Sequence, residues 1–255
     1  MPEDRRQTHA ERTRRWALAG IAGAVMLPAI GCASGGSSRR YREASAPAPR
    51  WPELPSRGVL ERRHAERIAP RSDHPTPDAV FHRRSEWATS GVIPRRMDRM
   101  LPVRRVTIHH DGMPPVDLRS PSAVAARINL IRQSHQQRGW GDIGYHYVVD
   151  PRGEVWEGRP LSWQGAHVAN QNPGNLGVLV LGNFERQAPT PAQLDALDRF
   201  VASRLGAYGL GLGSVYTHQE LAPTACPGRH LQRHMARTRG PQGRLAMLAT
   251  GGSLG

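Results

Sequence analysis

The sequence contains no lysine, so all 35 of its basic residues are arginine. Only 21 acidic residues oppose them, which leaves a formal net charge of +14. A charge of this size usually indicates an anionic partner, such as nucleic acid or a membrane surface. The arginines are spread along the chain instead of lying on one helix face, and coding bias toward arginine explains much of the absence of lysine. We therefore expect no nucleic-acid partner, while attraction to an anionic cell envelope stays open.

Cysteine is scarce, and long apolar runs are lacking. The two cysteines, Cys32 and Cys226, could form one disulfide, but their surroundings differ so much that each is better explained separately. Residues 16–31 are apolar throughout, yet a membrane-spanning helix needs about twenty such residues. A run of this length behind an arginine-rich start is typical of a secretory signal peptide, so we expect residues 1–32 to direct export.

Two details refine the expected export signal. Residues 13–18 resemble a twin-arginine signal, and residues 29–32 resemble a bacterial lipoprotein box in which Ala29 replaces the preferred leucine. Cys32 is then the expected lipidation site, and the chain is expected in the periplasm or cell envelope, held to a membrane by its lipid. An ordinary signal peptide with an incidental cysteine, or an uncleaved short anchor, remains the alternative.

Composition divides the rest of the chain into three parts. Residues 33–75 are rich in Pro, Gly, Ser and Arg and bury too little surface to offset chain entropy, so they are expected to form a disordered tether. Residues 76–235 are expected to form one folded domain. Residues 236–255 are rich in Gly and Arg and are expected to form a flexible tail.

Strand and helix patterns alternate within the expected domain. Ser120 with Pro121, and Thr190 with Pro191, are typical of helix starts. The expected strands cover residues 103–110, 146–150, 154–157 and 175–184, and the expected helices cover residues 121–138 and 191–207. This order predicts an α/β domain with a mostly buried, mixed central sheet flanked by helices, and a monomer is the default expectation.

The positions of several histidine residues and one cysteine indicate a metal site. His218 and Cys226 share one proline-stiffened loop, and His109 and His110 close the strand 103–110. Adjacent strand residues point to opposite faces, and His109 belongs to the more polar row. One histidine from each region plus Cys226 supplies the three ligands of a catalytic zinc site. The histidines could instead merely cap a strand end, and Cys226 could be a nucleophile with a histidine base or an inert buried thiol.

Seven short segments, distributed between residues 84 and 230, extend the pattern. They are 84–87 (RSEW), 107–110 (TIHH), 139–146 (GWGDIGYH), 165–167 (GAH), 175–184 (NLGVLVLGNF), 189–194 (PTPAQL) and 218–228 (HQELAPTACPG). In this order they resemble the zinc-dependent N-acetylmuramoyl-L-alanine amidase family, which includes phage amidases and the peptidoglycan recognition proteins. Each segment alone is a weak signal, whereas seven in register are strong.

The resemblance implies roles for individual residues. It makes His109, His218 and Cys226 the ligands of Zn²⁺, and Tyr145 and Thr224 the catalytic side chains. It places His167 and Asn175 near the substrate groove, where they bind substrate or serve only as structural hydrogen-bonding residues. The implied reaction is hydrolysis of the amide between N-acetylmuramic acid and L-alanine in peptidoglycan.

Two positions depart from the family's patterns. Another branch of the family has a catalytic glutamate where this chain has Leu179, and an aspartate where it has Cys226. Chemistry would then depend on Tyr145 instead of a carboxylate. Ala88 replaces the usual glycine after Trp87, away from the site. The alternatives to an enzyme are a recognition lipoprotein that binds peptidoglycan without cleaving it, and a purely structural envelope lipoprotein.

Overall fold

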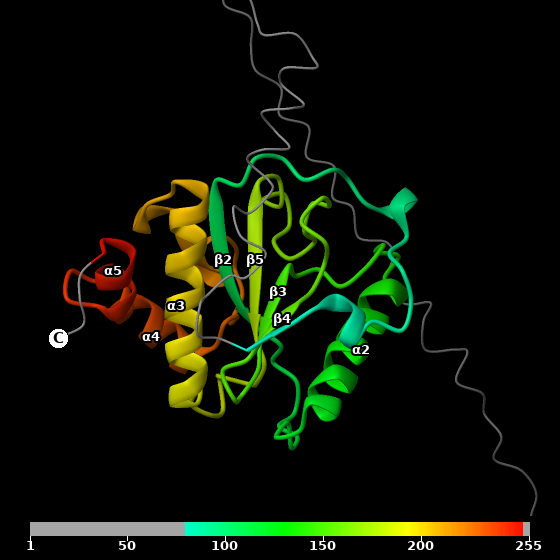
Figure 1. Cartoon of the computed structure of the whole chain (residues 1–255), viewed down its shortest axis with the longest axis horizontal. Helices are drawn as coiled ribbons and strands as arrows, with labels where there is room; N and C mark the ends of the chain where they lie inside the picture. Colours follow the sequence, from blue (N-terminus) through cyan, green and yellow to red (C-terminus); the bar gives the residue numbers. More distant parts are fainter. Residues whose placement is uncertain (1–79, 252–255) are drawn as a thin grey trace, which may run out of the picture. The chain divides into compact units, whose positions relative to one another are not determined.

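A six-stranded mixed sheet forms the centre of the fold. The computed structural model describes residues 80–251. Strands β3 and β4 pair antiparallel, as expected for the predicted hairpin, and the other pairs run parallel. The strand order is β1 (Phe81–His82), β4 (Val155–Glu157), β3 (Tyr147–Val149), β5 (Asn175–Val180), β2 (Arg105–His110) and β6 (Val215–Thr217) (Figure 1). This architecture confirms the predicted α/β class.

Two long helices begin where the sequence predicts. Helix α2 (Pro121–Gln137) starts after Ser120, whose hydroxyl accepts a hydrogen bond from the Ala123 backbone N–H. Helix α3 (Pro191–Tyr208) starts after Thr190, which forms a reciprocal capping box with Gln193. These bonds satisfy amide groups that the first helical turn leaves without partners, so each start is determined locally.

Helices α2 and α3 cover opposite faces of the sheet (Figure 1). Val106 and Ile108 of β2 pack with the apolar residues of α3, while Leu179 of β5 packs with those of α2. His109 pairs with Leu179 in the sheet, and paired residues of neighbouring strands point to the same face. His109 therefore faces the α2 side, as the alternation within the strand predicts.

Shorter elements complete the described part of the chain. They are the 3₁₀ turns η1 (Arg84–Glu86), η2 (Pro94–Arg96), η3 (Leu212–Ser214) and η4 (His218–Glu220), and the helices α4 (Arg229–Thr238) and α5 (Arg244–Ala249). Helices α4 and α5 lie beside α3 in Figure 1. Among the residues described, no helix combines the length and apolar character needed to cross a bilayer.

The carboxyl-terminal part of the chain differs from the predicted flexible tail at residues 236–255. Helix α4 continues to Thr238, and α5 places Leu245 in the core with no exposed surface. Thr238 connects α4 to both neighbouring helices, because its hydroxyl donates to Asp198 of α3 and accepts from the backbone N–H of Leu245 in α5. Composition alone suggested disorder, but α5 buries two apolar side chains, Leu245 and Ala246, which composition does not reveal.

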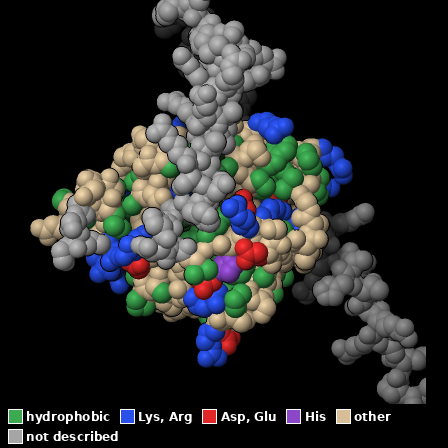
Figure 2. Space-filling model, in the orientation of Figure 1, with side chains coloured by type: hydrophobic (Ala, Val, Ile, Leu, Met, Phe, Trp, Pro, Cys, Tyr) green, Lys and Arg blue, Asp and Glu red, His purple; other side chains and the backbone are tan. Residues whose placement is uncertain are grey.

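The predicted export signal, the lipidation at Cys32 and the whole of the predicted tether at residues 33–75 lie outside the described residues. On the face drawn in Figure 2, arginine side chains of the described part are scattered, and some lie next to acidic ones. The scatter agrees with the spread of arginine along the sequence.

Replacing Leu245 tests whether α5 belongs to the domain. Leu245→Ala is expected to lower the free energy of unfolding by about 2–5 kcal/mol, because it leaves a cavity in a packed core. The measurement is urea unfolding followed by circular dichroism. Leu101→Ala is the matched control, since Leu101 is 50% exposed and its loss is expected to change stability by about 0.5 kcal/mol or less. Equal unfolding midpoints for the two variants would show that α5 does not contribute to the core.

Candidate metal centre

Parallel pairing of β2 with β6 brings His109 and His218 together. Ile108 pairs with Thr217, so the residue that follows each of them lies at the same end of two adjacent strands. The centres of the two imidazole rings are 4.7 Å apart. His109 is fully buried, and His218 is partly buried at the start of η4.

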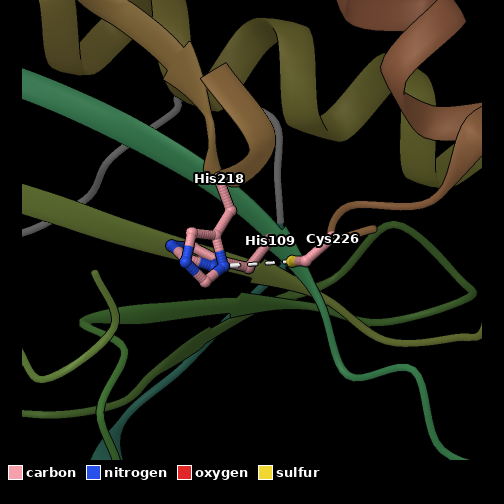
Figure 3. Close-up of side chains that lie close together, drawn as sticks. All are labelled: His109, His218 and Cys226. Atoms are coloured by element: carbon pink, nitrogen blue, oxygen red, sulfur yellow. Dashed lines mark hydrogen bonds between the residues drawn. The ribbon is translucent and has the colours of Figure 1, made fainter. Parts of the chain in front are cut away.

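Cys226 reaches the two histidines from the loop before α4 (Figure 3). Its backbone carbonyl accepts a hydrogen bond from the Gln219 N–H at 2.8 Å, and its backbone N–H donates to Thr224 Oγ1 at 3.2 Å. The Cys226 Sγ lies 3.6 Å from His109 Nδ1. One ligand atom from each of His109, His218 and Cys226 lies within 4.8 Å of the others.

The electrostatics of this group suit a divalent cation. Burial holds the pKa of His109 well below its usual value and also lowers the pKa of His218, so both imidazoles are neutral and can act as ligands. Burial raises the pKa of the Cys226 thiol to about 12, although the hydrogen bond from the His110 backbone N–H to Sγ, 3.4 Å long, acts in the opposite direction. A bound cation would supply the positive charge that the thiolate needs.

The donor set fits zinc. Zinc binds imidazole nitrogen and thiolate sulfur, and a catalytic zinc site has three protein ligands and leaves the fourth position to water or substrate. Ligand atoms about 2.0–2.3 Å from a common ion lie roughly 3–4 Å from one another. Small side-chain movements are therefore enough to bring His109, His218 and Cys226 around one ion.

Buried charges fix the segment that carries Tyr145. Asp142 is fully buried and forms ion pairs with Arg132 of α2 and Arg84 of η1. The buried guanidinium of Arg159 donates hydrogen bonds to the backbone carbonyls of Asp142 and Ile143. A buried charge is costly unless it is paired, so each of these bonds restrains the segment 139–146.

Tyr145 lies beside the histidines at the edge of a cavity. Its ring centre is 5.0 Å from that of His109. Burial raises the pKa of the phenol, as do the nearby Cys226 and Asp111, so the side chain is protonated at neutral pH. The cavity has a volume of about 360 Å³ and is lined by Asp111, Met113, Leu130, Ile131, Ser134, His135, Arg138 and Tyr145.

The other predicted site residues lie close to this group. Thr224 is exposed, and its hydroxyl holds the Cys226 loop as described above. His167 is buried with its ring against His109, and Asn175 is fully buried between Thr107 and the backbone of Gln171. The substrate-binding role of His167 and Asn175 stays a prediction.

The cavity wall formed by α2 was missed from the sequence. Leu130 is 49% exposed, whereas Val124, Ile128 and Ile131 of the same helix are buried. A large apolar residue outside the buried stripe of the helix is the sequence signal that could have indicated the cavity. A second cavity, of about 560 Å³, lies at the loop between α4 and α5. None of His109, His218 and Cys226 lines either cavity, but the first is lined by Tyr145, whose ring lies beside His109. We therefore assign the chemistry to the cavity at Tyr145.

Comparison with known proteins identifies relatives of two kinds, named as N-acetylmuramoyl-L-alanine amidases and as peptidoglycan-recognition proteins. A family model described as N-acetylmuramoyl-L-alanine amidase matches residues 99–229. A human N-acetylmuramoyl-L-alanine amidase is 32% identical over 156 residues, which cover 58% of this chain and 26% of that protein. A peptidoglycan-recognition protein of Drosophila simulans is 30% identical over 149 residues, which cover 58% of this chain and 81% of that protein. The chain thus spans about a quarter of the human amidase and most of the fly protein.

A solved structure shares the fold. A mutant of Drosophila peptidoglycan-recognition protein LB in complex with tracheal cytotoxin gives a TM-score of 0.53 at 26% identity, covering 59% of this chain and 89% of that chain. Amidases and recognition proteins therefore both occur among the relatives.

Zinc is expected to stabilise the folded protein through Cys226. After treatment with a chelator, zinc at about 100 times its dissociation constant is expected to raise the free energy of unfolding by about 2.7 kcal/mol. Cys226→Ala removes one of three ligands and is expected to lose most of this gain, as measured by thermal unfolding with and without zinc. Cys32→Ala is the control, because it removes the chain's other cysteine and is expected to keep the response. An equal response of both variants would exclude Cys226 as a ligand.

Proposed function

Because this chain belongs to the N-acetylmuramoyl-L-alanine amidase family, we propose that it is a zinc-dependent hydrolase that cleaves the amide between N-acetylmuramic acid and L-alanine in peptidoglycan. Water adds across the C–N bond in this reaction. The lactyl group of the sugar becomes a carboxylate, and the stem peptide leaves with a free amino group on L-alanine.

One observation carries the proposal. His109, His218 and Cys226 offer a ligand set for a catalytic zinc site, and the protonated phenol of Tyr145 lies beside it at the edge of a cavity. When bound, zinc polarises a carbonyl and lowers the pKa of water to about 7. The side chains of the protein carry out the remaining steps.

Tyr145 has the proton-donating role in this proposal. Its O–H can donate a hydrogen bond to the carbonyl oxygen of the scissile amide as negative charge develops there, and its raised pKa keeps that proton in place before the reaction. Leu179 lies beside His109 in the sheet, where another branch of the family has a glutamate, so Tyr145 is assigned the donor role instead of a carboxylate at that position. Thr224 supports the Cys226 backbone and presents an exposed hydroxyl next to the site.

The cavity at Tyr145 is proposed to hold part of the muramoyl peptide. Its wall combines apolar Leu130 and Ile131 with polar Ser134 and Arg138, which suits a ligand with both a peptide backbone and charged groups. The structure of the related fly protein contains tracheal cytotoxin, which supports a ligand derived from peptidoglycan for this chain.

The second candidate is a recognition protein that binds peptidoglycan without cleaving it. Relatives named peptidoglycan-recognition proteins favour this candidate. The presence of Cys226 within reach of His109 and His218 favours the enzyme, since binding of peptidoglycan alone requires no metal ligand at this place.

Digestion of purified peptidoglycan distinguishes the two candidates. The unmodified protein is expected to release stem peptides that begin with L-alanine, identified by mass spectrometry, and to leave glycan strands intact. Tyr145→Phe is expected to lower the rate about 10²-fold or more, because one proton donor to the developing charge is lost. Cys226→Ala is expected to remove measurable release.

Tyr208→Phe is the control for loss of a phenol hydroxyl. Tyr208 is the last residue of α3, on the opposite side of the sheet, and this variant is expected to keep full activity. Binding to peptidoglycan with no released peptide would establish the recognition protein instead. Products with new sugar reducing ends would contradict both candidates.

A further inference from the structure

A chain of hydrogen bonds lies behind His109, on the side of its ring away from Cys226. The Nε2 atom of His109 is 3.0 Å from Nδ1 of His167, and Nε2 of His167 is 3.1 Å from the backbone carbonyl oxygen of Asn175. Both imidazoles are buried. These hydrogen bonds therefore connect the candidate metal ligand His109 to the backbone at the start of β5.

The direction of each bond follows from the last acceptor. A carbonyl oxygen only accepts, so Nε2 of His167 carries the hydrogen. A neutral imidazole has one N–H, which leaves Nδ1 of His167 to accept the hydrogen bond from His109 Nε2–H. His109 then presents an unprotonated Nδ1, and this is the atom that lies 3.6 Å from Cys226 Sγ.

We propose that His167 is a positioning residue of the metal site, which selects the tautomer and the ring orientation in which His109 binds zinc through Nδ1. A histidine ligand usually donates its other N–H to a carboxylate, a backbone carbonyl or water, and such partners strengthen metal binding. In this chain a second imidazole lies between the ligand and the carbonyl. The inference rests on the proposed zinc site.

The surroundings of His167 hold its ring in one place. A Cβ atom on Gly177 would lie 2.6 Å from His167 Cδ2, and one on Gly165 would lie 2.5 Å from the same atom. Asn172 Oδ1 accepts hydrogen bonds from the backbone N–H groups of His167 and Val168. Two glycines thus leave a slot for the imidazole, and Asn172 fixes the backbone that carries it.

The geometry favours this role over direct contact with substrate. Both ring nitrogens of His167 have partners inside the protein, and only 7% of the residue is exposed. A substrate group could bind a ring nitrogen only by displacing His109 or the Asn175 carbonyl.

Zinc affinity tests the role without depending on catalysis. The full chain, His167→Leu and His167→Gln are titrated with zinc against a chromophoric chelator. Leucine has similar volume but no polar atom, so His167→Leu is expected to weaken zinc binding about 10- to 100-fold. The side-chain amide of glutamine can both accept and donate, so His167→Gln is expected to recover a large part of this loss.

A control variant and a separate stability measurement distinguish a positioning role of His167 from a purely structural role. His234→Gln changes a histidine of α4 that is bonded to Asp198, and it is expected to leave zinc affinity unchanged. Urea unfolding of the metal-free proteins reports any loss of stability by itself. If His167 were purely structural, both His167 variants would be less stable without metal while their folded forms kept the zinc affinity of the unmodified protein, and that result would overturn the proposal.

A second variant serves if His167→Leu does not fold. Gly177→Ala keeps the imidazole but pushes it out of its slot, and it is expected to weaken zinc binding as well. Gly206→Ala is its matched control, because nothing lies within 4 Å of the added carbon. An unmodified protein that binds no zinc would overturn the proposed enzyme and this role together. Tight binding by the unmodified protein and unchanged binding by the His167 and Gly177 variants would overturn the positioning role alone.

Discussion

The parallel pairing of β2 with β6 is the constraint on which the site depends. It places His109 and His218 side by side at the ends of two adjacent strands, although long stretches of the chain separate them. Cys226, 117 residues after His109, reaches the same point because the loop that begins at His218 turns back and bonds to itself through Gln219 and Thr224. Loss of the register between β2 and β6 would separate all three ligands at once.

Buried polar groups provide a second set of restraints, and each of them serves a functional segment. Asp142 with Arg132 and Arg84 holds the segment that carries Tyr145. The bonds from His109 through His167 to the Asn175 carbonyl hold the ring of a candidate ligand. Such groups cost free energy unless every partner is present, so they add little stability but define one arrangement.

Local signals made much of this structure predictable from the sequence. Alternation within residues 103–110 selected His109 over His110, and the caps at Ser120 and Thr190 located both long helices. The three proposed ligands followed from residue type and family resemblance. Strands β1 and β6 and helix α5 are too short to carry a periodic signal, and tertiary contacts hold them. The cavity wall on α2 and the proposed positioning role of His167 depend on distances between segments that no single stretch of sequence encodes.

X-ray absorption at the zinc edge tests the central claim, that one thiolate and two imidazoles of this chain hold a catalytic zinc ion. The purified protein loaded with one equivalent of zinc is expected to show one sulfur at about 2.3 Å and nitrogen or oxygen atoms at about 2.0–2.1 Å, with imidazole scattering from two histidines. A first shell without sulfur would contradict the account, because the ion would then lie away from Cys226.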